Sequence, residues 1–161
     1  MPRKSFQGKT VLITGAASGI GRATARAVVQ RGSRVVLTDI SPIEEIAGEL
    51  GDAVVHAESL DVSDHDAVQA LAEKAGTVDV VMNVAGIARW GSVDRMPHSD
   101  WRDLIEINLM GPINVIEAFV PPMIRAGRGG HLVNVSSAAG YFGLPWHAAY
   151  SASKFGLRGV S

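Results

Sequence analysis

Five short apolar runs recur along the chain, and each is followed by a stretch with helical spacing of apolar residues. The runs predict strands over residues 10–13, 35–38, 53–56, 78–82 and 131–135. Because each run is almost continuously apolar, both faces of the resulting sheet must be covered, which is typical of parallel strands. The right-handed crossover rule then makes a doubly wound parallel sheet of the α/β class the simplest topology.

The intervening stretches predict helices that cross over the sheet. Their expected ranges are 19–30, 42–50, 65–75, 99–125 and from about 149 onward. Asp64 is the expected N-cap of the third helix, because its carboxylate can accept a free backbone N–H there. We find no internal linker or repeat, so residues 1–161 are expected to form one domain or part of one.

Composition excludes several classes of protein. The formal charge of −1 and the pI of about 6.5 do not suit a general nucleic-acid binder. The absence of cysteine excludes a disulfide scaffold and a thiolate metal site. The five histidines lack metal-ligand spacing, so no metal site is expected.

No targeting segment is convincing, and the most apolar later stretch covers residues 109–124. It contains Glu117 and the prolines Pro112, Pro121 and Pro122. We therefore expect it to be too short and too broken to cross a bilayer. A soluble cytoplasmic protein is the expectation that follows.

The loop after the first strand contains three glycines with separate expected tasks. Gly15 permits a sharp turn, Gly19 lets a pyrophosphate approach the backbone, and Gly21 lets the helix pack closely on the strand. Ser18 and Ile20 complete the loop, and the following helix N-terminus offers free N–H groups to phosphates. The strand–loop–helix context favours a dinucleotide site over the alternative, a tight turn without a ligand.

Asp39 ends the second strand, where a carboxylate can hydrogen-bond the adenosine ribose of a dinucleotide. The same charge repels a 2′-phosphate, and neither Ser18 nor Ile40 is basic. Arg22 and Arg34 could still reach such a phosphate. The pattern favours NAD over NADP, although Asp39 alone could simply be a solvated acid at a strand end.

Tyr150 and Lys154 lie four residues apart at the expected start of the last helix, on one helical face. A phenol is a weak base at neutral pH, and a neighbouring cation favours its ionised form. Such a pair can exchange a proton with an alcohol or carbonyl. Ser136 and Ser137 end the fifth strand, at the sheet edge where doubly wound sheets bind ligands.

These motifs, in this order, resemble the short-chain dehydrogenase/reductase family, in its short, non-extended branch. The motifs that carry the resemblance are Thr14-Gly15-x-x-x-Gly19-x-Gly21, Asp61, Asn83-Val84-Ala85-Gly86, Asn108, Ser136-Ser137 and Tyr150-Ser151-Ala152-Ser153-Lys154. The resemblance covers the whole chain and implies a Rossmann-like sheet with strand order 3-2-1-4-5. It also implies that the C-terminal strands of that fold are absent from these residues.

The resemblance implies a role for each matching residue. Tyr150 would exchange the proton, Lys154 would assist it and bind the nicotinamide ribose, and Ser137 would orient the substrate oxygen. Asn108 would hold a water in a proton relay. The matching cofactor-binding residues are Gly15, Ser18, Gly19, Ile20, Gly21, Asp39, Asp61, Val62, Asn83, Ala85, Gly86, Tyr150 and Lys154. Val84 departs from the family, which often has a second Asn there.

Pro112 gives a separate physical argument about the same region. Proline cannot donate a hydrogen bond to the carbonyl four residues earlier, which is that of Asn108. We therefore expect a kink or irregular turn over residues 108–112, with the Asn108 carbonyl free to hold a water. The alternative is a proline that only bends the helix around the core.

Together these features predict an NAD(P)-dependent oxidoreductase that interconverts a secondary alcohol and a ketone. The alternative is a non-catalytic dinucleotide-binding or assembly module. Aromatic and apolar residues between Ser137 and Tyr150 suggest an apolar or cyclic substrate, although loop packing explains them equally: Tyr141, Phe142, Leu144 and Trp146. The resemblance also implies a homo-oligomer, a dimer or tetramer, for the full-length protein.

Overall fold

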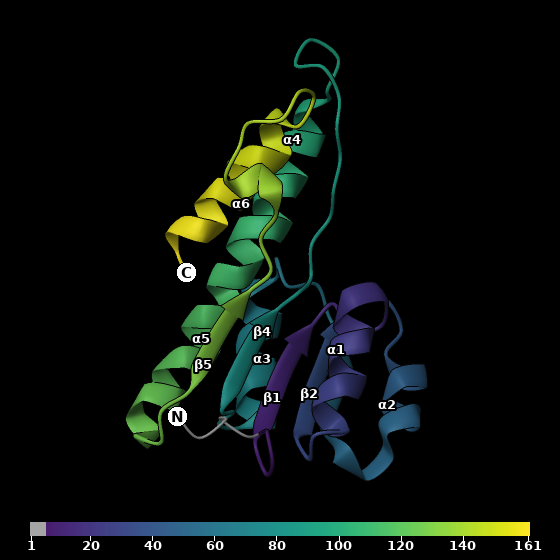
Figure 1. Cartoon of the computed structure of the whole chain (residues 1–161), viewed down its shortest axis with the longest axis vertical. Helices are drawn as coiled ribbons and strands as arrows, with labels where there is room; N and C mark the ends of the chain where they lie inside the picture. Colours follow the sequence, from purple (N-terminus) through teal and green to yellow (C-terminus); the bar gives the residue numbers. More distant parts are fainter. Residues whose placement is uncertain (1–5) are drawn as a thin grey trace.

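The computed structural model describes residues 6–161 and is built on a five-stranded parallel sheet (Figure 1). The strand order is β3-β2-β1-β4-β5, as expected. The strands are β1 (Thr10–Thr14), β2 (Arg34–Asp39), β3 (Val54–Ser59), β4 (Val80–Asn83) and β5 (His131–Asn134). The doubly wound α/β architecture predicted from the sequence is therefore confirmed.

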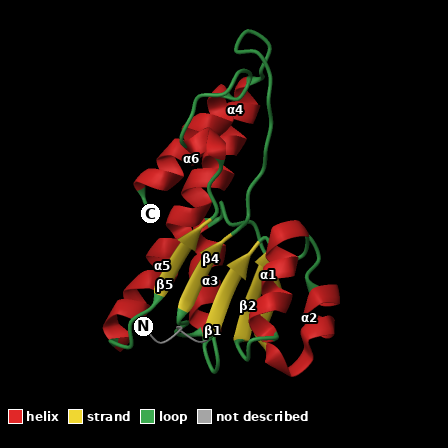
Figure 2. Ribbon diagram, in the orientation of Figure 1, coloured by secondary structure: helices red, strands yellow, loops and turns green. Residues whose placement is uncertain are grey.

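Helices cover both faces of the sheet, as Figure 2 shows. On one face lie α1 (Gly19–Val29) and α2 (Glu44–Leu50); on the other lie α3 (His65–Ala75) and α5 (Gly111–Ala126). Two short 3₁₀ turns that the sequence did not predict are η1 (Gly51–Ala53) and η3 (Ala138–Gly140). The Asp64 carboxylate caps α3 by accepting the N–H of Ala67, as expected.

The three central strands, β1, β2 and β4, contribute to two cores because successive side chains point to opposite faces. Val11 and Ile13 of β1 pack in the core beneath α1 and α2, whereas Leu12 packs in the core beneath α3 and α5. All three side chains are completely buried. This two-sided burial is why the runs are continuously apolar rather than alternating.

A continuous helix from His98 to Ala126 comprises α4 (His98–Ile105), the π-helical turn η2 (Glu106–Met110) and α5. The N–H of Gly111 reaches back to the carbonyl of Glu106, five residues earlier, as in a π-helix. The extra residue in this turn accommodates Pro112, whose ring cannot follow a regular α-helix. The predicted irregular turn is therefore confirmed.

The expectation that prolines interrupt this stretch is wrong. Pro121 and Pro122 lie inside α5 without ending it. The helix is long and apolar enough to cross a membrane by length and composition alone, a test that core helices also pass. Its apolar side chains, including Val115 and Phe119, are buried against the sheet, as in a core helix.

The helices α4 and α6 (Ala148–Gly159) pack against each other beyond the carboxyl edge of the sheet (Figure 1). We call this part of the molecule, residues 84–110 and 135–159, the α4–α6 region. Two loops lead into it, one from β4 and one from β5. It therefore stands above the edge where the sequence predicts the site.

Candidate cofactor and active site

The glycine loop shows why each of its glycines is needed. Gly15 has a φ of +68°, and a Cβ there would lie 2.9 Å from the Cα of Ala85. A Cβ on Gly21 would clash with the carbonyl oxygen of Gly15, so α1 could not pack on β1. Gly19 differs, because its φ is +49° but a Cβ there would point into open space. Gly15 and Gly21 therefore serve packing, whereas Gly19 leaves backbone accessible to a ligand.

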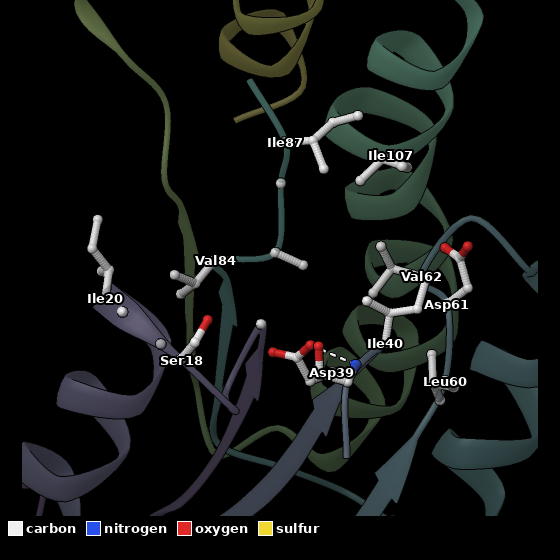
Figure 3. A pocket seen from close by; sticks show the side chains of 16 residues that line it. Ser18, Ile20, Asp39, Ile40, Leu60, Asp61, Val62, Val84, Ile87 and Ile107 are labelled. Carbon is white, nitrogen blue, oxygen red and sulfur yellow. Dashed lines mark hydrogen bonds between the residues drawn. The ribbon is translucent and has the colours of Figure 1, made fainter. Parts of the chain in front are cut away.

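A cavity of about 440 Å³ opens between this loop and the ends of β2, β3 and β4. Figure 3 shows Ser18 and Ile20 on one side, Ile40, Asp61 and Val62 on the other, and Asp39 between them. The lining residues are Gly15, Ser18, Gly19, Ile20, Gly21, Asp39, Ile40, Ser41, Leu60, Asp61, Val62, Val84, Ala85, Gly86, Ile87 and Ile107. Ten of the predicted cofactor-binding positions thus share one cavity.

Asp39 is nearly buried at the floor of this cavity and braces both of its sides. One carboxylate oxygen accepts the N–H of Ala17 in the glycine loop, and the other accepts the N–H of Ser41, each at 2.9 Å. Because a carboxylate offers about four lone-pair sites, it can still accept ribose hydroxyls. The alternative of a solvated acid at a strand end does not match this burial, since Asp39 is 8% exposed.

The other walls of the cavity are held by two buried polar side chains, Thr14 and Asn114, for which the sequence alone predicted no role. The hydroxyl oxygen of Thr14 accepts the N–H groups of Val84 and Ala85, each at 3.0 Å. The side-chain amide of Asn114 donates to the carbonyl of Val62 at 3.0 Å. A polar residue inside an otherwise apolar strand or helix was the available signal for both.

Asn83, Tyr150 and Lys154 do not line the cavity. The side-chain amide of Asn83 instead donates to Asn134 on the neighbouring strand β5 at 2.9 Å. Its contact is therefore with the sheet, and not with the cavity in which the resemblance implies cofactor binding.

Asn108 is completely buried and joins η2 to the loop after β4 and to α6. Its side-chain oxygen accepts the N–H of Ile87 at 2.8 Å, and its amide donates to the Ile87 carbonyl at 2.9 Å and to the Ser153 hydroxyl at 3.1 Å. Ser153 in turn donates to the carbonyl of Tyr150 at 2.7 Å. These bonds use both N–H groups of the side-chain amide and connect Asn108 to the start of α6. The sequence alone did not reveal this connection.

Lys154 is buried on the inner face of α6, with 6% of its surface exposed. Its ammonium group donates to the carbonyl of Val135 at 3.0 Å and lies 5.8 Å from the centre of the Tyr150 ring. Burial lowers the pKa of Lys154, because it disfavours the charged form. The cation and the phenol are thus neighbours, as the spacing predicts.

Gly86 joins the two parts of the site, because it lines the cavity and faces both polar groups. A Cβ at this position would lie 2.9 Å from the Asn108 side-chain oxygen and 3.6 Å from the Lys154 ammonium. The cavity therefore ends beside the buried Asn108 and Lys154.

The two serines after β5 differ in their hydrogen bonds. Ser136 donates to the carbonyl of Lys154 at 3.3 Å, whereas the Ser137 oxygen accepts the N–H of Ala139 at 3.2 Å. Ser137 thus retains its hydroxyl proton as a donor, as an orienting serine requires.

Aromatic side chains gather beside Tyr150. The ring of Trp90 stacks on His147 with centroids 5.9 Å apart, and His147 meets Tyr150 edge-on at 6.3 Å. Tyr141, Phe142 and Trp146 are each more than half exposed. The Tyr141 ring is contacted by the Arg158 guanidinium, 4.2 Å from the ring centre, whereas Phe142 and Trp146 each expose 67% of their surface.

The arrangement combines a glycine loop that is unobstructed at Gly19, a carboxylate with further acceptor capacity and a phenol–ammonium pair at one sheet edge. Comparison with known proteins agrees with this combination. The family model described as short chain dehydrogenase matches residues 9–161. The 3-oxoacyl-[acyl-carrier-protein] reductase FabG of Thermotoga maritima is 41% identical over 97% of this chain. The D-threitol dehydrogenase of Mycolicibacterium smegmatis is 40% identical over 97% of this chain.

Among solved structures, a short chain dehydrogenase from Mycobacterium paratuberculosis bound to NAD superposes with a TM-score of 0.90 at 29% identity. That match covers 97% of this chain and 65% of the other. The chain likewise spans 66% of the Thermotoga reductase and 63% of the threitol dehydrogenase. The chain thus spans slightly less than two thirds of the length of each of these relatives.

Proposed function

The chain belongs to the short chain dehydrogenase family, and on that premise we propose that it forms the cofactor-binding and catalytic part of an NAD-dependent oxidoreductase. The proposed reaction interconverts a secondary alcohol and a ketone. The observation that carries the proposal is the junction at Gly86, where the cavity meets Asn108 and Lys154. A nucleotide-binding module alone needs no buried ammonium beside a phenol at that point.

The residues of the cavity fit a dinucleotide. Gly19 exposes backbone at the positive end of α1, which suits a pyrophosphate. Asp39 retains acceptor sites for ribose hydroxyls, and its charge disfavours a 2′-phosphate, so NAD is the proposed cofactor. Bound NAD would supply the hydride acceptor in the oxidation and, as NADH, the donor in the reduction.

The chain's own groups would manage the proton. Tyr150 takes the proton from the alcohol oxygen, or gives it to the carbonyl oxygen in the reverse direction. The Lys154 ammonium, 5.8 Å from the centre of the Tyr150 ring, stabilises the phenolate. Ser137 donates a hydrogen bond to the same substrate oxygen and keeps its proton. Asn108 holds the loop and α6 in register, and its backbone carbonyl is the proposed water site.

The test has two steps. Calorimetric titration of the chain should detect NADH binding, and absorbance of the reduced nicotinamide should detect oxidation of a panel of secondary alcohols. Tyr150→Phe removes only the phenol oxygen and should lower turnover roughly 10²- to 10⁴-fold without changing NADH affinity. Equal loss of affinity and turnover would indicate a structural role for Tyr150. Binding without turnover of any alcohol would instead favour the non-catalytic module.

A further inference from the structure

A positively charged side chain directly follows the glycine loop of the proposed cofactor site and is held by acidic partners. Arg22 follows Gly21, and its backbone N–H donates to the carbonyl of Ser18. Gly21 and Ser18 both line the cavity. Arg22 therefore sits at the start of α1, directly behind the glycine loop.

The partners of Arg22 come from α2, which packs beside α1 on the same face of the sheet. Its guanidinium lies 2.5 Å from the Glu45 carboxylate and 3.2 Å from that of Glu49. Arg26, one turn further along α1, binds Glu49 through two nitrogens at 2.6 and 2.7 Å. Four side chains thus form one ion-pair network that joins α1 to α2.

This network is fully ionised near neutral pH. The hydrogen bond from Arg26 is the largest of the effects that lower the pKa of Glu49 to about 2. The hydrogen bond from Arg22 likewise lowers the pKa of Glu45, and that of Arg22 itself is raised by both glutamates. Arg22 and both glutamates are consequently charged under the conditions in which a dinucleotide would bind.

One atom of Arg22 is left without a partner. Its Nε is buried and forms no hydrogen bond within residues 6–161, because the terminal nitrogen Nη2 makes the contacts to the glutamates. The two carboxylates therefore set the orientation of the guanidinium, and this orientation leaves one of its donors without a hydrogen bond. A guanidinium released from them could present several donors to a phosphate.

The segment that precedes α2 lines the cavity near Asp39, so it connects the α2 glutamates to the proposed ribose site. Ser41 lines the cavity, and its N–H is bound by Asp39, which carries the charge nearest to where the ribose is proposed. The helix α2 begins three residues later, at Glu44. Arg22 thus follows a cavity-lining glycine and pairs with α2, and the segment that leads into α2 lines the same cavity beside Asp39.

We propose that Glu45 and Glu49 help to determine cofactor selectivity by holding Arg22 in ion pairs, away from a 2′-phosphate. The inference rests on the proposed function, because it assumes a dinucleotide in this cavity. Glu45 would then be a specificity-determining residue that does not itself line the site. Asp39 repels the phosphate, and the glutamates withhold the cation that could neutralise it.

The test measures dissociation constants of NADH and NADPH by calorimetry on the whole chain. Wild type should bind NADH more tightly than NADPH. Glu45→Gln should tighten NADPH binding roughly three- to tenfold, the range expected when one partly exposed ion pair is redirected to a phosphate, and should change NADH binding less than about twofold. Glu49→Gln, which removes the more distant partner, should act in the same direction but less strongly.

Two controls separate release of Arg22 from a general loss of negative charge. Glu44→Gln removes the same charge one residue away, and within the described chain Glu44 forms no ion pair with Arg22. Adding Arg22→Gln to Glu45→Gln should remove the gain in NADPH affinity. Melting temperatures of all variants establish that each is folded.

Equal NADPH gains in Glu44→Gln and Glu45→Gln, a gain that survives Arg22→Gln, or a wild type without preference for NADH would each overturn the inference. These results would leave the proposed function intact, since NADH would still bind. A wild-type chain that binds neither dinucleotide would contradict the proposed function itself.

Discussion

The two ends of the site are held in place by different forces. At the glycine-loop end, close backbone packing decides the geometry, since Gly15 and Gly21 approach other backbone atoms too closely for any side chain. In the α4–α6 region, side-chain hydrogen bonds from Asn108, Ser153 and Lys154 hold loops that lack strand partners. The comparison indicates that close backbone packing adds to the hydrogen bonds of Asp39 and Thr14 at the cofactor end, whereas the proposed catalytic end depends mainly on a few polar side chains.

The largest expected effect is at Gly21. Gly21→Ala places a methyl group against the carbonyl of Gly15, so α1 must move away from β1. Because backbone cannot yield as a flexible side chain does, we expect a loss of about 3 kcal/mol in the free energy of unfolding. Urea denaturation followed by circular dichroism would measure it.

Gly19→Ala is the matched control, since its methyl group points into open space. Its positive φ costs about 1 kcal/mol, but the fold should persist while NADH affinity falls. If both variants were equally stable, the glycine loop would not be fixed by close packing.

The corresponding change in the α4–α6 region is Asn108→Ala. It removes both hydrogen bonds to Ile87 and the bond to Ser153, leaving buried or half-buried backbone groups without partners. We expect a loss of about 2 kcal/mol, and about 1 kcal/mol for Ser153→Ala, which removes one of the same bonds. Hydrogen exchange should show the loss at the Ile87 amide. Unchanged protection of that amide in Asn108→Ala would contradict the role assigned to this side chain.

The same contrast explains what could be predicted from the sequence. The parallel sheet and the cavity floor follow from the alternation of runs, because parallel topology brings the carboxyl ends of strands to one edge. The strand order was implied by the family resemblance. The turn at Pro112 was predictable because proline lacks a donor. These features depend on backbone chemistry, which short motifs encode directly.

Features that depend on side chains meeting across the fold were not predictable. Sequence position alone leaves Arg22 able to reach a 2′-phosphate, and only the packing of α1 beside α2 reveals its pairing with Glu45 and Glu49. Arg34, the other candidate, begins β2 at the end opposite Asp39. Likewise, the bond between Asn108 and Ser153 joins residues 45 positions apart, which no local spacing indicates.

A smaller effect is expected at Trp146, the one non-glycine residue among 6–161 with a positive φ, at +62°. Its side chain is 67% exposed, so its removal should cost little. Trp146→Gly should be more stable than Trp146→Ala by about 1 kcal/mol, because glycine tolerates the left-handed conformation. Thermal denaturation of the two variants would measure the difference. An alanine variant as stable as the glycine variant would mean that this loop does not keep its backbone conformation.

The smallest expected effect is a change in how stability depends on pH, and it arises from Lys154. Burial lowers its pKa in the folded chain, so between that value and the ordinary value of 10.5 the unfolded chain binds more protons. Stability should therefore rise with pH across this window, and the cost of the buried charge is fully present below it. Lys154→Met removes the titrating group and should abolish this part of the rise.

Lys154→Arg is the matched variant, because it retains the cation but does not lose a proton in this range. Between about pH 7 and about pH 10, the denaturation midpoint of wild type should therefore rise relative to the midpoints of both variants. Equal pH dependence in all three chains would mean that Lys154 is hydrated rather than buried. Because the Lys154 ammonium donates to the Val135 carbonyl and adjoins the Tyr150 ring, such hydration would also loosen the polar contacts that hold the catalytic end of the site.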